Sequence, residues 1–199
     1  MMSLLSLVIG YLLGSVSFSC LAGKLLKGID IRQHGSGNAG ATNTMRVLGK
    51  GPGITVLLLD VIKGMSAVWT GSYLSGGSSL FEVLAGISVI VGHNWPIFFG
   101  FRGGKGIATT IGVMATLAFF PALYAGIIAI LSIVLTRYVS LGSLLFTALL
   151  PIFIWFMGLP NEILVLSLLL FVFAWFKHRS NIVKLLKGNE NKLGAKKQL

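Results

Sequence analysis

Residues 92–110 read GHNWPIFFGFRGGKGIATT and concentrate glycines, cations and a histidine within an otherwise apolar chain. Glycines leave backbone N–H groups accessible to a ligand, and Arg102 and Lys105 add positive charge beside them. Because the segment runs directly into an apolar stretch, we expect the turn to lie at the N-terminus of a membrane helix, whose dipole also favours a negative ligand. The stretch therefore predicts an anion-binding turn at a membrane surface.

The composition around this stretch is that of an integral membrane protein. Hydrophobic residues make up 55% of the 199 residues and charged residues only 11%, which leaves too little polar surface for an ordinary soluble domain. At about 20 residues per span, the chain has room for six or seven helices and for no separate soluble domain. We therefore predict an all-α, polytopic membrane protein in which residues 1–199 form one domain.

Seven apolar runs are predicted to span the membrane as a helix bundle, or six if the short, glycine-rich fourth run is re-entrant. They cover residues 2–22, 53–74, 80–98, 106–120, 122–137, 141–157 and 160–177. Nearly all of the 16 Lys and Arg residues follow the first, third, fifth and seventh runs, whereas the connections near 75–80, 118–122 and 157–161 carry none. This asymmetry predicts an external N-terminus and a cytoplasmic C-terminus.

The positive-inside rule also explains the net charge of +11 without nucleic acid, since aromatic and basic residues do not interleave as they do in nucleic-acid-binding segments. We expect residues 178–199 to form a short basic cytoplasmic tail, with an amphipathic helix and then a disordered end. Phospholipid headgroups of the bilayer are its expected partner. No oligomeric partner is indicated.

A second glycine-rich stretch, residues 35–46 (GSGNAGATNTMR), lies in the first predicted cytoplasmic loop. Ser36 or Asn38 is expected to cap a short helix that ends near residue 48, before a breaker at residues 51–53. On such a helix Asn38, Thr42 and Arg46 share one face, which indicates a second anion site. The alternative is a flexible loop of ordinary turn residues. Because both glycine-rich stretches are expected on the cytoplasmic side, together they could hold two phosphate-bearing substrates or one large one.

Polar side chains at three further places are candidates for the same site. Asp60 and Lys63 lie within the second run, three residues apart, and are interpreted either as a structural ion pair or as a substrate contact. His178 and Asn181 share a face if the last helix continues beyond residue 177, although His178 is equally consistent with an interfacial anchor. Ser143, near the start of the sixth run, is a further candidate.

The spacing of these residues excludes several chemistries. The leading glycine of a P-loop is missing at the required distance, and Lys105 is followed by Gly106 instead of Ser or Thr. Asp30 and Asp60 are too isolated for a metal-dependent phosphotransferase, so we predict neither a metal nor another cofactor. No carboxylate follows His93 within a few residues, so the histidine–acid pair of many acyltransferases is missing and His93 is expected to brace the glycine loop. The remaining residues suit transfer from an already activated substrate such as an acyl phosphate.

Three motifs resemble those of the bacterial acyl-phosphate:glycerol-3-phosphate acyltransferase family: Gly35–Asn43, the Lys63-Gly64 pair and Gly92–Thr109. The resemblance covers essentially the whole chain, with one departure at Arg102, where the family pattern has lysine. It implies transfer of a fatty acyl chain from acyl phosphate to the 1-hydroxyl of glycerol 3-phosphate, giving lysophosphatidate and phosphate in phospholipid synthesis. The implied location is the bacterial cytoplasmic (inner) membrane, with the active site on the cytoplasmic side.

The resemblance and the residue chemistry together define the expected site. The catalytic residues are expected to be Ser36, Arg46, Lys105, His178 and Asn181. The substrate- and phosphate-binding residues are expected to be Asn38, Thr42, Asn43, Lys63, His93, Asn94, Arg102, Gly103, Gly104, Gly106 and Ser143. We expect a substrate phosphate, with a second pKa of about 6, to accept the hydroxyl proton, because the protein lacks a convincing base.

Two other functions fit part of the sequence pattern. A phosphate or organic-anion transporter also uses glycine-broken loops with cations. Two features argue against a transporter. The polar residues are predicted on one face of the membrane instead of at the bilayer midplane, and the two halves of the chain are not related by an internal sequence repeat. A non-catalytic membrane scaffold would leave both glycine-rich stretches unexplained.

Overall fold

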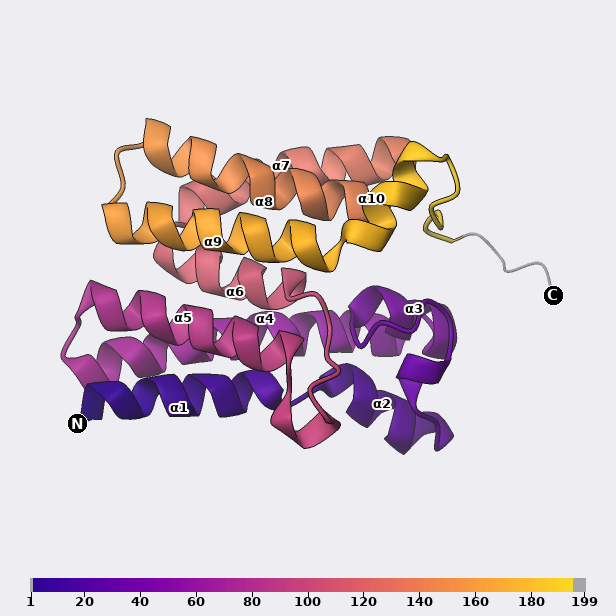
Figure 1. The fold of residues 1–199 in the computed structure, drawn as a ribbon, viewed down its shortest axis with the longest axis horizontal. Helices are drawn as coiled ribbons and strands as arrows, with labels where there is room; N and C mark the ends of the chain where they lie inside the picture. The colour runs from indigo at the N-terminus through magenta and orange to yellow at the C-terminus, as the bar shows by residue number, and fades with distance from the viewer. Residues whose placement is uncertain (1, 195–199) are drawn as a thin grey trace. The chain divides into compact units, whose positions relative to one another are not determined.

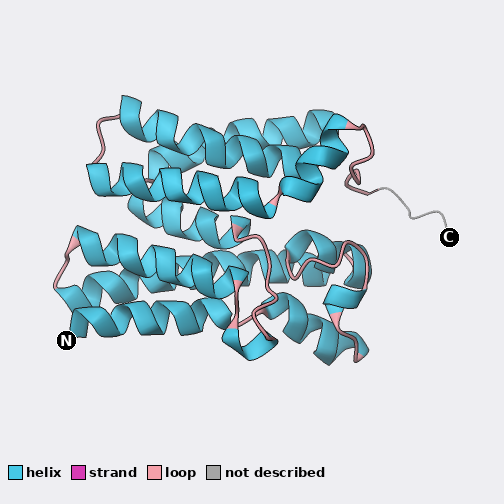
Figure 2. Cartoon of the chain, viewed as in Figure 1, coloured by secondary structure: helices cyan, strands magenta, loops and turns pink. Residues whose placement is uncertain are grey.

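A computed structural model describes residues 2–194, whose regular structure is entirely helical (Figure 1, Figure 2). The all-α prediction is therefore confirmed for this part of the chain. Contacts divide the chain into two compact units, the first ending at Leu117 and the second beginning at Ala118. Each unit has its own set of packed helices, and the prediction that they act as one domain stays a prediction.

The first unit is a group of packed helices. Its elements are α1 (Met2–Ser15), α2 (Phe18–Lys27), the 3-10 turn η1 (Ile31–Gln33), α3 (Ala41–Leu48), α4 (Lys50–Ser75), α5 (Ser79–Asn94), the 3-10 turn η2 (Ile97–Phe99) and α6 (Ile107–Leu117). Helices α1, α4 and α5 pack against one another, and α6 packs on α4. A Cβ added at Gly14 of α1 would collide with the Val89 carbonyl of α5, so these helices approach at backbone distance. Small residues at helix contacts are typical of membrane proteins, where close packing drives helix association.

The run predicted over residues 2–22 is two helices, because α1 ends at Ser15 and α2 begins at Phe18. The Ser17 hydroxyl caps α2 by accepting a hydrogen bond from the Cys20 N–H. The break releases carbonyl groups at the end of α1, and the Lys63 ammonium donates to those of Gly14 (3.2 Å) and Val16 (2.9 Å). A side chain from α4 thus supplies the partners that a continuous helix would have supplied.

The helix predicted in the first glycine-rich stretch starts later than expected. Helix α3 begins at Ala41 with Gly40 as its N-cap, so neither Ser36 nor Asn38 caps it, and Asn38 does not share its face with Thr42 and Arg46. The predicted breaker at residues 51–53 is also wrong, because α4 already begins at Lys50. Proline is tolerated in a first helical turn, where its missing N–H has no partner in the helix, and this position suits residue 52.

The second unit contains α7 (Phe119–Thr136), α8 (Val139–Phe156), α9 (Asn161–Lys177) and α10 (Arg179–Leu186). Helix α8 packs against both α7 and α9. Helix α9 does not continue straight beyond residue 177, since α10 bends away from it by 64°, so the condition under which His178 and Asn181 share a helix face is not met. The helix predicted in the tail is confirmed as α10, whereas residues 195–199 of the predicted disordered end lie outside the described residues.

Five helical segments among the described residues are long and apolar enough to cross a membrane: Met2–Lys27, Lys50–Ser75, Ser79–Phe99, Phe119–Thr136 and Val139–Phe156. A sixth results if α9 and the bent α10 count as one span. Helix α6, the fourth predicted span, has 11 residues. At 1.5 Å per residue it extends about 16 Å, roughly half of the hydrocarbon core. The seven-span count therefore stays a prediction.

Candidate active site

The first glycine-rich turn, Gly35–Gly37, folds around the side chain of Asn43. The backbone N–H of Ser36 donates to Asn43 Oδ1 (2.7 Å), and Asn43 Nδ2 donates to the carbonyls of Ile31 (3.1 Å) and His34 (3.0 Å). Gly35 has a φ of 63°, and a Cβ there would collide with Asn43 Oδ1. Because both amide hydrogens of Asn43 are used by backbone carbonyls, none is left for a phosphate. Asn43 therefore holds the turn, and its role as a phosphate ligand stays a prediction.

The second glycine-rich turn, Gly100–Gly106, packs directly on the end of α5. The Gly104 N–H donates to the His93 carbonyl (3.1 Å), and a Cβ added at Gly104 would collide with His93 Nε2. Asn94 is buried, and its side-chain oxygen lies against Gly106 at the start of α6. His93 and Asn94, at the end of α5, thus pack against the turn, which agrees with the expected bracing role of His93.

The two glycine-rich stretches, residues 35–46 and 92–110, lie against each other within the first unit. A Cβ added at Gly104 would lie 2.6 Å from the carbonyl oxygen of Ala39, so the two backbones are in close contact there. Arg32 forms a second connection, because its Nη1 donates to the carbonyls of Phe99 (2.6 Å) and Arg102 (3.2 Å). Two segments whose hydrogen-bonded residues are 67 and 70 positions apart in the sequence therefore form one surface, as expected for a shared anion site.

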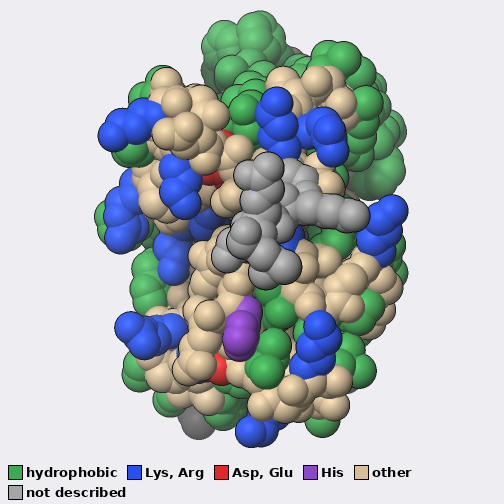
Figure 3. Space-filling view, turned by 90° about the vertical axis from the view of Figure 1, so that its right-hand side faces the viewer, with side chains coloured by type: hydrophobic (Ala, Val, Ile, Leu, Met, Phe, Trp, Pro, Cys, Tyr) green, Lys and Arg blue, Asp and Glu red, His purple; other side chains and the backbone are tan. Residues whose placement is uncertain are grey.

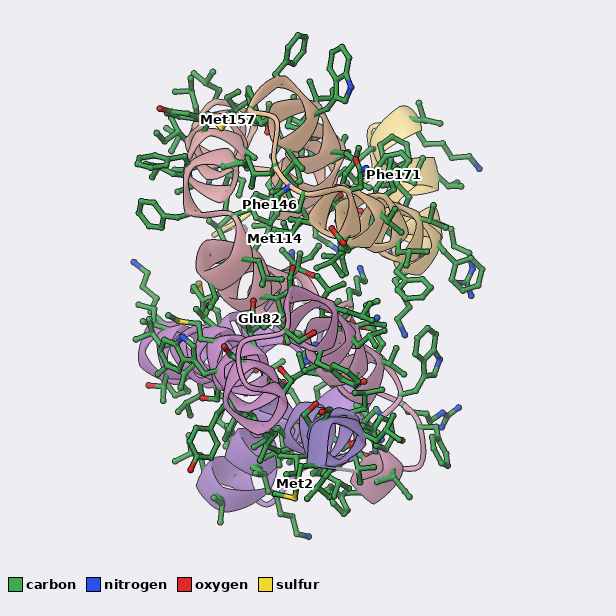
Figure 4. The ribbon with its side chains drawn as sticks, turned by 90° about the vertical axis from the view of Figure 1, so that its left-hand side faces the viewer. Met2, Glu82, Met114, Phe146, Met157 and Phe171 are labelled. Atoms are coloured by element: carbon green, nitrogen blue, oxygen red, sulfur yellow. The ribbon has the colours of Figure 1, made fainter. Side chains whose placement is uncertain are left out.

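The surface lies at one end of the first unit. The other end, seen in Figure 4, carries the starts of α1 and α5, where Met2 and Glu82 are labelled. Figure 3 views the side on which α2 and α3 lie and shows Lys and Arg side chains exposed there. Of the predicted residues in the two turns and α3, Ser36, Arg46 and Arg102 are exposed, whereas Asn38, Thr42 and Lys105 are half-buried. This exposure leaves cations accessible to a ligand.

A buried ionic cluster lies behind the second turn. The Lys63 ammonium is 2.7 Å from Asp60 Oδ1, and it also donates to the carbonyls of Gly14 and Val16. These contacts place Lys63 in a buried ion pair, which is the structural interpretation of this residue, and its role as a phosphate ligand stays a prediction. His93 Nδ1 lies 3.6 Å from the same Asp60 oxygen. The expectation that no acid lies near His93 is therefore wrong, because the acid comes from another helix.

The sequence matches the model of the family described as glycerol-3-phosphate acyltransferase over residues 4–188. The chain belongs to the glycerol-3-phosphate acyltransferase family. It is 58% identical to the glycerol-3-phosphate acyltransferases of Halalkalibacterium halodurans and of Shouchella clausii, with 96% of each chain covered. These matches confirm the family resemblance and leave the transporter interpretation without support.

Two solved structures are similar to this acyltransferase-family chain throughout. The glycerol 3-phosphate form of PlsY, an integral membrane glycerol 3-phosphate acyltransferase, has a TM-score of 0.91 and 37% identity, with 96% of both chains covered. The lysophosphatidic acid form of PlsY has a TM-score of 0.88 and 36% identity, with 96% of this chain and 95% of that chain covered. The likeness extends to both compact units.

The predicted site residues of the second unit have contacts of their own in this acyltransferase-family chain. His178 lies at the bend between α9 and α10, is buried, and its Nδ1 is 2.8 Å from the Ala174 carbonyl. Asn181 Nδ2 donates to Glu190 Oε1 (2.9 Å). Ser143 donates to the Val139 carbonyl one turn earlier in α8. That His178, Asn181 and Ser143 meet the glycine-rich turns stays a prediction.

Sequence reasoning missed two residues that support the turns. Asp60 stood out as a costly intramembrane charge, but its proximity to His93 required knowledge of how α4 and α5 pack. Arg32 was read as one of several loop cations. The sequence feature that could have indicated Arg32 is the pattern Asp-x-Arg at residues 30–32, shortly before the first turn. A carboxylate two residues away can hold a guanidinium in a fixed orientation.

Proposed function

We propose that the chain transfers a fatty acyl group from acyl phosphate to the 1-hydroxyl of glycerol 3-phosphate, giving 1-acyl-glycerol 3-phosphate (lysophosphatidate) and phosphate. The observation that carries the proposal is the contact between two glycine-rich stretches, each of which contains cations, in a chain of the acyltransferase family. The glycerol 3-phosphate form of PlsY supports that molecule as acceptor. Acyl phosphate is supported as donor because it is already activated and needs charge neutralisation and an oxyanion site more than an enzyme nucleophile.

The proposed reaction balances without a cofactor. The hydroxyl oxygen of glycerol 3-phosphate attacks the acyl carbonyl carbon, a new ester bond forms, and the bond from that carbon to the phosphate oxygen breaks. Phosphate leaves with the bonding electron pair. Lys105 and Arg46 neutralise the phosphates, and the N–H groups of Gly103 and Gly106 stabilise the oxyanion, since that of Gly104 donates to His93. Ser36, His178 and Asn181 complete the phosphate pocket in this proposal.

The hydroxyl proton passes to a substrate phosphate in the proposed mechanism. His93 has a carboxylate beside Nδ1, but its Nε2 lies against Gly104, which favours bracing over proton transfer. Rate–pH profiles of His93→Ala and His178→Ala test this assignment. Both variants should keep the two titrating limbs of the wild type. Loss of one limb with unchanged glycerol 3-phosphate binding would assign the base to that histidine.

We place this site on the cytoplasmic side of the bacterial cytoplasmic (inner) membrane, in one domain of seven spans with an external N-terminus and a cytoplasmic basic tail over residues 178–199. Support comes from the cations of α2 and the following loop, which the positive-inside rule assigns to the cytoplasm. In intact cells, a membrane-impermeant maleimide should label Ser78→Cys and leave Lys27→Cys unlabelled. The reverse pattern would contradict the orientation. The buried Cys20 gives little background.

An assay with purified protein in detergent tests the function itself. Acyl phosphate, acyl-CoA and acyl carrier protein are offered in turn with glycerol 3-phosphate, and lysophosphatidate should form with acyl phosphate. The absence of product with every donor would contradict the enzyme assignment. Product with acyl-CoA alone would contradict the donor.

A further inference from the structure

We propose that Arg32 is a positioning residue that fixes the second glycine-rich turn against the first, an inference that rests on the proposed function of those turns. Arg32 lies in η1, three residues before the first turn, and its side chain reaches the segment that leads into the second turn. It therefore connects the two parts of the site through one guanidinium.

One edge of the guanidinium is held by Asp30. Arg32 Nε donates to Asp30 Oδ1 (2.9 Å), and Nη2 donates to Oδ2 (2.8 Å), which is a bidentate pair. The hydrogen bonds from Arg32 lower the pKa of Asp30 from 3.8 to about 2. The carboxylate thus stays ionised at all physiological pH values, and the guanidinium keeps a fixed orientation.

The other edge holds the second turn. Nη1 donates to the carbonyls of Phe99 and Arg102, which flank a reversal formed by Gly100 (φ 64°) and Phe101 (φ 59°). A left-handed conformation at a residue other than glycine costs roughly 1–2 kcal/mol, so the surroundings must stabilise Phe101. Arg32 supplies two of the bonds that do so.

The hydrogen-bond count favours positioning over substrate binding. A guanidinium has five N–H donors, and the contacts to Asp30, Phe99 and Arg102 use four of them. Arg32 is also half-buried, whereas Arg46 and Arg102 are exposed. Lys105 follows Arg102 by three residues, so movement of the carbonyl that Arg32 holds would move the cation and the glycine N–H groups of the site.

The test compares Arg32→Ala and Arg32→Lys with Arg137→Lys. Arg137 is a matched control, because its guanidinium also donates to a backbone carbonyl, that of Leu193, but lies in the second unit. Lysine keeps the positive charge but lacks the planar set of N–H donors of a guanidinium. A misplacement of about 1 Å costs roughly 100-fold in rate, so we expect kcat/KM to fall about 10- to 100-fold in Arg32→Ala and somewhat less in Arg32→Lys. Arg137→Lys should remain within about twofold of wild type on the same argument.

Two readouts separate positioning from a general loss of stability. Guanidinium ion added to the assay should restore part of the Arg32→Ala activity and none of the Lys105→Ala activity. Amide hydrogen exchange of residues 99–106 should accelerate in Arg32→Ala, while that of α4 and α5 stays unchanged. Wild-type kinetics and exchange in Arg32→Ala, or uniform acceleration without rescue, would overturn the inference. A wild-type protein that makes no product with any donor would contradict the proposed function, whereas the exchange comparison would still decide the role of Arg32.

Discussion

The two glycine-rich turns of the first unit are held by different kinds of partner. Gly35–Gly37 folds around Asn43, which lies in the same segment of chain. Gly100–Gly106 is held by His93, by Arg32 and by close contact with Ala39. The first turn is therefore a local structure, whereas the second depends on contacts with η1, with Ala39 and with α5. Substitutions should consequently act over a short range in the first turn and over the whole site in the second.

Lys105→Ala should have the largest effect, because it removes a half-buried cation from the second turn. Loss of one electrostatic contact to a developing charge typically costs about 100- to 1,000-fold in kcat. Steady-state kinetics with acyl phosphate measure the loss, and thermal unfolding in detergent should be close to that of wild type. Lys24→Ala, an exposed cation on α2, is the control. Near-normal turnover in Lys105→Ala would remove Lys105 from the site.

Asn43→Ala should damage the first turn without touching the second. It removes the acceptor of the Ser36 N–H and one of the two hydrogen bonds to each of the Ile31 and His34 carbonyls. Each such hydrogen bond contributes about 0.5–1.5 kcal/mol. We expect a lower unfolding temperature and a rise in KM for glycerol 3-phosphate. Asn161→Ala, at the exposed start of α9, should leave both unchanged. Normal stability in Asn43→Ala would show that the turn forms without this side chain.

Substitution of single glycines separates crowding from backbone strain in the second turn. A Cβ at Gly104 would collide with His93, and such overpacking costs about 1–3 kcal/mol and displaces the turn. A Cβ at Gly100 meets no atom within 4 Å but has a φ of 64°, so Gly100→Ala should cost about 1 kcal/mol and little activity. Gly51→Ala meets no neighbour within 4 Å and serves as control. Equal activity of the Gly104 and Gly100 variants would refute the close contact.

Asp30→Asn should have the smallest effect, since its amide oxygen can still accept from Arg32. The folded pKa of about 2 lies below the ordinary 3.8, so the charged pair stabilises the protein above pH 3.8 and loses this contribution as the pH falls through about 2. Exposed pairs contribute up to about 1 kcal/mol. The difference in unfolding temperature between wild type and Asp30→Asn should be constant from pH 5 to 8 and disappear near pH 2. A difference that grows on acidification would contradict this assignment.

The sequence predicts the local features well and the contacts between distant segments poorly. Glycines and cations predict both turns, and the apolar runs predict helices, because those signals are carried by neighbouring residues. The break between α1 and α2 at residues 16–17 contains neither glycine nor proline, so the local sequence does not predict it. The carbonyl groups at this break are hydrogen-bonded by Lys63 from α4. The approach of Asp60 to His93 depends on helix packing, which one sequence alone does not reveal.

Amide hydrogen exchange of the wild-type protein with and without glycerol 3-phosphate tests the central claim, that both turns form one phosphate site. Glycerol without the phosphate is the control ligand. The account predicts that saturating glycerol 3-phosphate slows exchange in residues 35–38 and in residues 103–106 together, and that glycerol slows neither. Protection of only one turn, or of neither, would contradict it.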